Sequence, residues 1–130
     1  MNKFKRYCKA LQLEDNNELI EEYKKVHARG CVWKEIEDGM KEIGIIDMEI
    51  YISGTTLFMI MDTVEDFNHE DAMTKLGTLP RQAEWEEFVS KFQKSSPNSS
   101  AKEKWQLVER IYELSQHQNS EIKDGYLKKG

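Results

Sequence analysis

Residues 45–64, IIDMEIYISGTTLFMIMDTV, decide the fold of this chain. Two apolar runs in this segment flank a polar loop that contains Gly54. In the first run Met48 and Ile50 fall on one face and Glu49 on the other, which is the alternation of a β-strand. Two strand-like runs around a glycine-containing loop predict an antiparallel hairpin.

The sequence before the hairpin predicts a strand and a helical region. Residues 4–13 are strand-like, and Asp15 with Glu18 resembles the capping box that begins a helix. Apolar residues then recur at helical spacing, are interrupted at Gly30, and resume over 33–44. We therefore expect one strand followed by a helical region that is broken in the middle.

The sequence after the hairpin predicts helices and one more strand. A short helix is expected near 69–76, followed by a helix that has Pro80 in its first turn. Residues 104–114 carry apolar side chains on both faces, as in a strand that is covered on both sides. Residues 116–130 have few apolar side chains and are expected to form a disordered tail.

Together these elements define the expected fold class. The order strand, helix, strand, strand, helices, strand is the split βαβ pattern of ferredoxin-like α+β domains. We predict a βαββαβ antiparallel sheet with the helices on one face. A chain of 130 residues accommodates one such domain, which we place at residues 1–115, with the tail at 116–130.

Composition and charge exclude several classes of partner. The chain has 24 acidic and 19 basic residues, and its net charge of −5 argues against binding to nucleic acid. The apolar runs are too short to span a membrane, and the N-terminus lacks the apolar stretch of a signal peptide. Cys8 and Cys31 are too few for a disulfide framework. We expect a soluble cytoplasmic protein without a nucleic-acid or membrane partner.

Sequence motifs for cofactors and metals are absent from the chain. It has no glycine-rich dinucleotide loop, no phosphate loop and no His-Glu-x-x-His motif. Its histidines, His27, His69 and His117, are far apart in the sequence and lack the spacing of metal ligands. We therefore expect neither a cofactor nor a metal site.

Tyr23 and His27 are the residues whose spacing best suits chemistry. They are four residues apart on the first predicted helix, so they project from one face with Cβ atoms roughly 5–6 Å apart. Histidine exchanges protons near neutral pH, and tyrosine can hydrogen-bond a hydroxyl-rich ligand. Alternatively, both are residues at the edge of the core whose polar atoms are satisfied by the backbone. Spacing alone favours this second interpretation.

Three further residues have both a structural and a functional interpretation. Trp85 shares a helical face with Phe88, which favours a place in the core, although tryptophan also forms a platform for the apolar face of a sugar. Glu86 belongs to a solvated face or accepts a hydrogen bond from a sugar hydroxyl. Met48 packs in the core of the hairpin or lines an adaptable pocket.

Several stretches taken together resemble the L-rhamnose mutarotase family. They lie in order over about residues 5–114: RYC at 6–8, LQL at 11–13, EYKKVH at 22–27, WKEI at 33–36, GIIDMEIYI at 44–52, LFM at 57–59, WEEF at 85–88 and ERIYEL at 109–114. The resemblance implies a small ferredoxin-like fold that dimerises through its sheets, as in dimeric α/β barrels. It also implies interconversion of the α and β anomers of L-rhamnose without a metal or an organic cofactor.

The resemblance also implies roles for single residues. The Tyr-x-x-x-His motif of the family matches Tyr23 and His27, which makes His27 the proton donor and Tyr23 a sugar contact. Bacterial rhamnose enzymes of the family have a tyrosine in place of Met48 and a Trp-Trp pair in place of Trp85 and Glu86. The pattern resembles a divergent branch whose members are often called L-fucose or L-rhamnose mutarotases.

The resemblance therefore predicts a homodimeric mutarotase for a monosaccharide, a 6-deoxy-hexose such as L-rhamnose or L-fucose. The ring opens and recloses by acid–base catalysis: His27 is catalytic and protonates the ring oxygen, and the base is Glu86, Glu49 or a bound water. The residues expected to bind the sugar are Tyr23, Trp85, Glu86 and Met48. Two alternatives are a cofactor-free monooxygenase-like barrel and a non-catalytic sugar-binding module.

Overall fold

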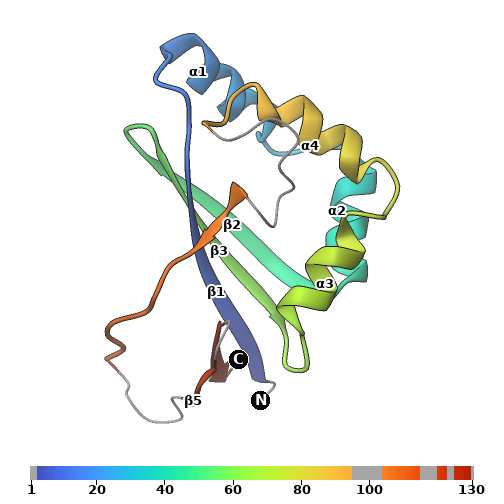
Figure 1. Ribbon diagram of the computed structural model, residues 1–130, viewed down its shortest axis with the longest axis vertical. Coiled ribbons are helices and arrows are strands. Elements are labelled where there is room, and N and C mark those ends of the chain that lie inside the picture. Colours follow the sequence, from blue (N-terminus) through green and yellow to red (C-terminus); the bar gives the residue numbers. More distant parts are fainter. Residues whose placement is uncertain (1–2, 95–103, 115–119, 123–124, 130) are drawn as a thin grey trace.

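The computed structural model describes residues 3–94, 104–114, 120–122 and 125–129 of the chain. Its strands form one antiparallel sheet, which Figure 1 shows as a twisted layer beside the helices. In order across the sheet, the strands are β2 (Ile45–Ser53), β3 (Thr56–Val64), β1 (Lys3–Gln12), β6 (Gly125–Lys129) and β5 (Ser120–Ile122), and β4 (Gln106–Leu107) also pairs with β1.

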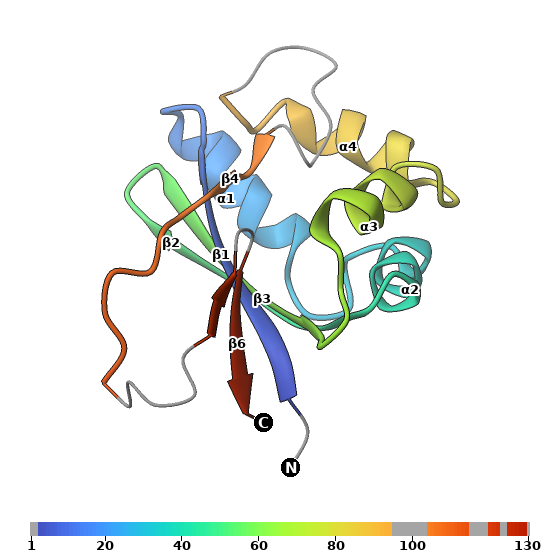
Figure 2. The same cartoon turned by 60° about the horizontal axis from the view of Figure 1, so that its bottom comes forward.

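The helices of the described residues lie on one side of this sheet, as Figures 1 and 2 show. They are α1 (Asn17–Val26), α2 (Lys34–Glu42), α3 (His69–Leu76) and α4 (Gln82–Ser90). The side chains of β1 alternate accordingly: Tyr7, Lys9 and Leu11 are buried beneath the helices, whereas Cys8 and Ala10 between them are only half-buried. The predicted α+β fold with its helices on one face is confirmed.

Local signals in the sequence begin and end the helices. Asn16 caps α1, because its Oδ1 accepts a hydrogen bond from the N–H of Leu19 at 3.0 Å. Gly44 follows α2 with a φ of 104°, a conformation that favours glycine. The Gly44 carbonyl accepts a hydrogen bond from the N–H of Val64 at 2.9 Å. The end of α2 is thereby joined to the end of the hairpin.

The hairpin has the predicted alternation of faces. Met48 of β2 lies opposite Met61 of β3, and both belong to the face that packs against the helices. Glu49 lies opposite Ile60 on the other face of the sheet. This register decides which of the predicted site residues can meet, because a side chain on one face cannot reach a cavity on the other.

Two groups of buried apolar side chains fill the space between the sheet and the helices. One includes Leu11, Tyr23 and Trp85, and the other includes Tyr7 and Met61. The partly buried side chains that pack against both groups are Met40, Ile50 and Trp105. The core is therefore continuous along the sheet, with its two halves linked by these three side chains.

The closing strand predicted over 104–114 is wrong for most of its length. Within that segment only Gln106 and Leu107 pair with β1, opposite Ala10 and Lys9. β6 pairs with residues 3–6 of β1, so that end of the edge is taken by another strand. Residues 108–114 form no strand, and Ile111 has a relative exposure of 90%. The apolar pattern of residues 104–114 does not reveal which part of the β1 edge is open to pairing.

Two other boundaries also differ from the sequence-based expectation. The tail predicted to be disordered contains β5 and β6, because ladder hydrogen bonds come from backbone groups and a segment with few apolar residues can still cover a sheet edge. The other tail residues, 116–119, 123–124 and 130, lie outside the described residues. α4 begins at Gln82 instead of including Pro80, since Arg81 before it has a left-handed φ of 64°.

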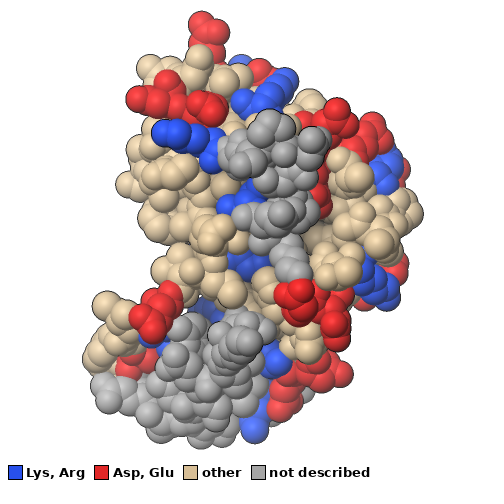
Figure 3. Space-filling model, in the orientation of Figure 1, with Lys and Arg blue, Asp and Glu red and all other residues tan. Residues whose placement is uncertain are grey.

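Charged side chains lie on the outside of the helices. Figure 3 shows acidic and basic groups next to one another along the edge that the helices form. Ion pairs on this surface include Lys34 with Asp38 at 2.6 Å and Arg81 with Glu84 at 3.1 Å. No helix in the described part of the chain is long and apolar enough to cross a membrane.

Candidate active site

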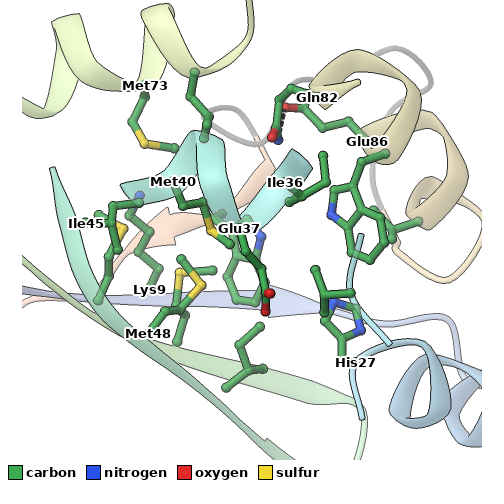
Figure 4. Close-up of a pocket in the computed structure, with 18 of the residues that line it drawn as sticks. Lys9, His27, Ile36, Glu37, Met40, Ile45, Met48, Met73, Gln82 and Glu86 are labelled. Carbon is green, nitrogen blue, oxygen red and sulfur yellow. Dashed lines mark hydrogen bonds between the residues drawn. The ribbon is translucent and has the colours of Figure 1, made fainter. Parts of the chain in front are cut away.

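A cavity of about 460 Å³ lies between the sheet and the helices. Its size is that of a site for a small organic ligand. All four helices and strands β1, β2 and β3 contribute to its wall. Figure 4 shows two ends of different character: one holds Met40, Met48 and Met73, and the other holds His27, Gln82 and Glu86.

His27 lines this cavity from the C-terminal end of α1. Its Nδ1 lies 3.0 Å from the carbonyl oxygen of Tyr23, one turn earlier in the helix. Because a carbonyl oxygen only accepts hydrogen bonds, Nδ1 carries the proton and donates it to Tyr23. In the neutral ring Nε2 therefore has a free lone pair and acts as a proton acceptor.

The surroundings of His27 favour this neutral form and fix the ring. Burial lowers the pKa of His27 below its ordinary value of 6.5, against a smaller opposite effect of the hydrogen bond to the Tyr23 backbone. The imidazole stacks on the Tyr23 ring with centroids 4.1 Å apart and meets the Trp85 ring edge-on at 5.6 Å. At neutral pH His27 is thus an oriented base between two aromatic rings.

Tyr23 is almost fully buried, and its main contact with the site is the stacking of its ring on His27. Only 4% of its surface is exposed, and its side chain is hydrogen-bonded with that of Gln93. Burial raises the pKa of the Tyr23 hydroxyl well above its usual value, so this group stays protonated. Both interpretations of the Tyr23–His27 pair therefore hold in part: Nδ1 is satisfied by the backbone, and the pair still lines the cavity.

The other predicted site residues also line the cavity. Trp85 has a relative exposure of 8% and meets the Trp33 ring edge-on at 5.1 Å, so that it belongs to the core and to the cavity wall at once. Half-buried Glu86 accepts a hydrogen bond from Nε2 of Gln82 at 2.8 Å. Met48 reaches the cavity from β2. The fold thus brings all five residues to one space.

Glu49, one of the candidate bases, does not reach this cavity. It lies on the face of β2 that points away from the helices, and its Oε1 accepts a hydrogen bond from the Tyr51 hydroxyl at 2.9 Å. Both side chains are exposed on that face. Within one chain, Glu49 is therefore wrong as the base.

Lys9 lines the cavity and was missed by the sequence-based selection. Only 2% of its surface is exposed, and burial lowers its pKa from 10.5 to about 8. A signal was present, because strand alternation puts position 9 on the same face as Tyr7 and Leu11. A lysine placed between two buried apolar residues of one strand face is unusual and marks a candidate site residue.

Three more polar side chains in the cavity wall were missed because their elements are far apart in the sequence. Gln82 and Gln93 each have a buried Oε1 without a hydrogen-bond donor among the described residues. Lys104 donates a hydrogen bond from Nζ to the carbonyl of Glu86 at 3.2 Å. Donors and acceptors in an apolar wall suit a small ligand that carries several hydroxyl groups.

The described residues contain no group of three or more potential ligands that could hold a metal ion. The chemistry that these side chains offer is hydrogen bonding and proton transfer. His27 accepts a proton at Nε2, and the glutamine oxygens accept hydrogen bonds. Together these groups suit a polar molecule that donates hydrogen bonds.

Known proteins resemble this chain in sequence. Residues 6–114 match the model of the L-rhamnose mutarotase family. The L-fucose mutarotase of Xanthomonas campestris pv. campestris is 35% identical over 111 residues, which are 85% of this chain and 89% of that protein. A UPF0734 protein of Dictyostelium discoideum is 37% identical over 115 residues, or 85% of this chain and 90% of that protein.

A solved structure extends the comparison to the fold. The crystal structure of L-rhamnose mutarotase from Formosa agariphila superposes with a TM-score of 0.59 at 20% identity, covering 84% of this chain and 97% of that chain. The fold and the cavity define a ferredoxin-like α+β protein with a small-molecule site between sheet and helices. The chain belongs to the L-rhamnose mutarotase family.

Proposed function

We propose that this protein is a mutarotase that interconverts the α and β anomers of a 6-deoxy-hexose such as L-rhamnose or L-fucose. The observation that carries the proposal is the imidazole of His27, which lines the cavity and whose Nδ1 hydrogen bond to Tyr23 leaves the lone pair of Nε2 available. The family match and the L-fucose mutarotase relative support the same reaction.

The reaction needs only proton transfers. His27 Nε2 takes the proton of the anomeric hydroxyl, the C1–O1 bond becomes a carbonyl, and the C1–O5 bond breaks while O5 receives a proton. Rotation about C1–C2 and reclosure then give the other anomer, and the two protons return. A positioned acid or base contributes roughly 10²–10⁴-fold to such a step. No oxidant, reductant or cofactor takes part in this balance.

This assignment reverses the direction of proton transfer expected from the sequence, in which His27 was the donor to the ring oxygen. The neutral ring with a proton on Nδ1 has no proton to give from Nε2. The second transfer, to O5, falls to Glu86 or to a water. Glu86 lines the same cavity and is oriented by the hydrogen bond from Gln82.

The cavity wall suits a 6-deoxy sugar. The buried oxygens of Gln82 and Gln93 are acceptors for hydroxyl groups, and the Trp85 ring is a surface for C–H groups. Met40 and Met48 provide apolar contacts for the methyl group at C6. We further propose that the protein works in the cytoplasm as a homodimer.

The test is anomer exchange measured by saturation-transfer NMR with L-rhamnose and L-fucose. Wild type is expected to exceed the protein-free rate, and His27→Ala to lose roughly 10²-fold or more of that acceleration. Because neutral His27 is the active form, the wild-type rate should rise with pH through a pKa below 6.5 and then level off. Cys31→Ala, at an exposed position outside the cavity, is the matched control.

Other outcomes would contradict the role of His27 or favour one of the alternative functions. A His27→Ala protein that folds and retains the wild-type rate contradicts the assignment of His27. Saturable sugar binding without faster exchange favours the non-catalytic sugar-binding module. Oxygen consumption with aromatic substrates favours the monooxygenase-like alternative.

A further inference from the structure

Lys9 carries a charge at the centre of the inner sheet face. On that face its neighbours along β1 are Tyr7 and Leu11, which belong to the two different groups of buried apolar side chains. Only 2% of its surface is exposed, and it lines the cavity. Figure 4 shows Lys9 at the end of the cavity where the methionines gather, away from His27.

Lys9 has no hydrogen bond or ion pair among the described residues, and burial alone accounts for its lowered pKa. Two other lysines do have hydrogen-bond partners. Lys5 Nζ donates a hydrogen bond to the carbonyl oxygen of Phe67 at 2.6 Å, and Lys104 Nζ donates one to the carbonyl oxygen of Glu86 at 3.2 Å. An ammonium removed from water without a partner is costly to the fold. Its donors are therefore available to a ligand in the cavity.

A pyranose in this cavity presents opposite sides of its ring to the two ends. C1 and C4 face each other across a six-membered ring. A sugar whose anomeric hydroxyl lies at His27 Nε2 therefore directs its C4 substituent toward the methionine end. Lys41 and Asp47 also line the cavity, but both are exposed. Lys9 is the buried hydrogen-bond donor at that end.

We propose that Lys9 is a specificity-determining residue that donates a hydrogen bond from its ammonium to the C4 hydroxyl of the sugar. This inference rests on the proposed mutarotase function and names the hydroxyl by which the site selects its substrate. The C4 hydroxyl is equatorial in L-rhamnose and axial in L-fucose. A donor that projects from a β-strand meets one of these two orientations better than the other, because rigid elements hold a side chain in one geometry.

The experiment compares two sugars that differ only at C4, L-fucose and 6-deoxy-L-glucose, in the saturation-transfer assay. Wild type is expected to prefer one of them by about tenfold or more in kcat/KM, because the free energy of a hydrogen bond from a charged donor corresponds to a ratio of that size. Lys9→Met should bring the two sugars within about threefold, mainly through KM, since C4 is remote from the reacting bond. Lys9→Arg should retain part of the preference.

Matched measurements separate binding from chemistry. Lys5→Met removes a lysine from the same strand and face but outside the cavity, and should leave the preference unchanged. The ε-carbon NMR signal of Lys9, assigned by its loss in Lys9→Arg, should move when L-fucose or 6-deoxy-L-glucose is added. This signal reports contact even if no exchange occurs.

The possible failures are distinguishable. Wild type without accelerated exchange overturns the mutarotase function, while a sugar-dependent Lys9 signal in that same sample still supports the Lys9–sugar contact. An active wild type whose C4 preference survives in Lys9→Met overturns the Lys9 inference alone. A Lys9 signal that does not respond to saturating sugar overturns it as well.

Discussion

Lys9 lowers the stability of the folded protein, and the same side chain is the proposed contact for the sugar. Its place between Tyr7 and Leu11 is that of an apolar residue, and the neighbours of the strand satisfy none of its donors. A hydrophobic residue there would complete the core. Natural proteins accept such local conflicts at functional sites, where the group is needed by a ligand.

We expect Lys9→Met to raise the free energy of unfolding at pH 7. A pKa lowered from 10.5 to about 8 corresponds to a loss of up to about 3 kcal/mol in the folded state when the lysine is charged in the unfolded chain. Between these two values the unfolded chain binds more protons, so wild-type stability should rise with pH relative to the variant. Urea denaturation at pH 7 and pH 10 measures both effects.

The sign of the stability difference between Lys9→Met and wild type tells whether Lys9 has a partner in the folded protein. A variant that is less stable than wild type at pH 7 would mean that Lys9 has a stabilising partner in the folded protein. A difference between the two proteins that does not shrink at high pH would mean that its pKa is not lowered. The same variant serves as the specificity test above, and its expected stability ensures a folded sample.

At the scale of elements, the junction of α2 and β2 shows how a short sequence signal positions the hairpin. Gly44 ends the helix, and its carbonyl pairs with the N–H of Val64 at the far end of β3. This contact joins α2, β2 and β3 at one point. Met40 and Met48, which line the cavity from α2 and β2, depend on that junction for their relative placement.

We expect Gly44→Ala to destabilise the fold more than Gly30→Ala. Both glycines have a positive φ, of 104° and 83°, so alanine costs roughly 1–2 kcal/mol at either position. At Gly44 the new Cβ would also lie 3.0 Å from Val64 Cγ2, whereas at Gly30 it meets nothing within 4 Å. The collision adds roughly 1–3 kcal/mol at Gly44. Urea denaturation of the two variants side by side checks the difference, and equal losses would contradict it.

At the scale of the whole molecule, the sheet face that points away from the helices carries apolar side chains. Tyr51 and Phe58 lie opposite each other in the hairpin, with relative exposures of 52% and 38%, and Val64 has 38%. Exposed apolar groups gathered on one sheet face are typical of an interaction surface. A second copy of the chain packed on this face accords with the proposed homodimer.

We expect the protein to sediment as a dimer and Phe58→Asp to sediment as a monomer. A carboxylate at this position would be buried without a partner in a sheet-to-sheet interface, which opposes association. Lys34→Asp, on the exposed outer side of α2, should leave the dimer intact because exposed ion pairs contribute little. Analytical ultracentrifugation of the three proteins tests this, and a monomeric wild type would refute the dimer.

Much of the fold was determined by sequence patterns that act locally. The hairpin and the helix over residues 69–76 were predicted because each depends on neighbours in the chain. The start of α1 was predicted to within one residue, since the cap is Asn16 and not Asp15. Tyr23 and His27 were found for the same reason, since helix geometry alone brings residues four apart together.

Only the tertiary structure decided which distant residues share the cavity and which partner covers each edge of β1. Lys9 and Gln82 line the same cavity as His27 because strands and helices far apart in the sequence enclose one space. Glu49 was removed from that space by the register of β2. β6, and not residues 108–114, covers one end of β1. Periodicity specifies the face a side chain occupies within its element, whereas packing between elements specifies what that face meets.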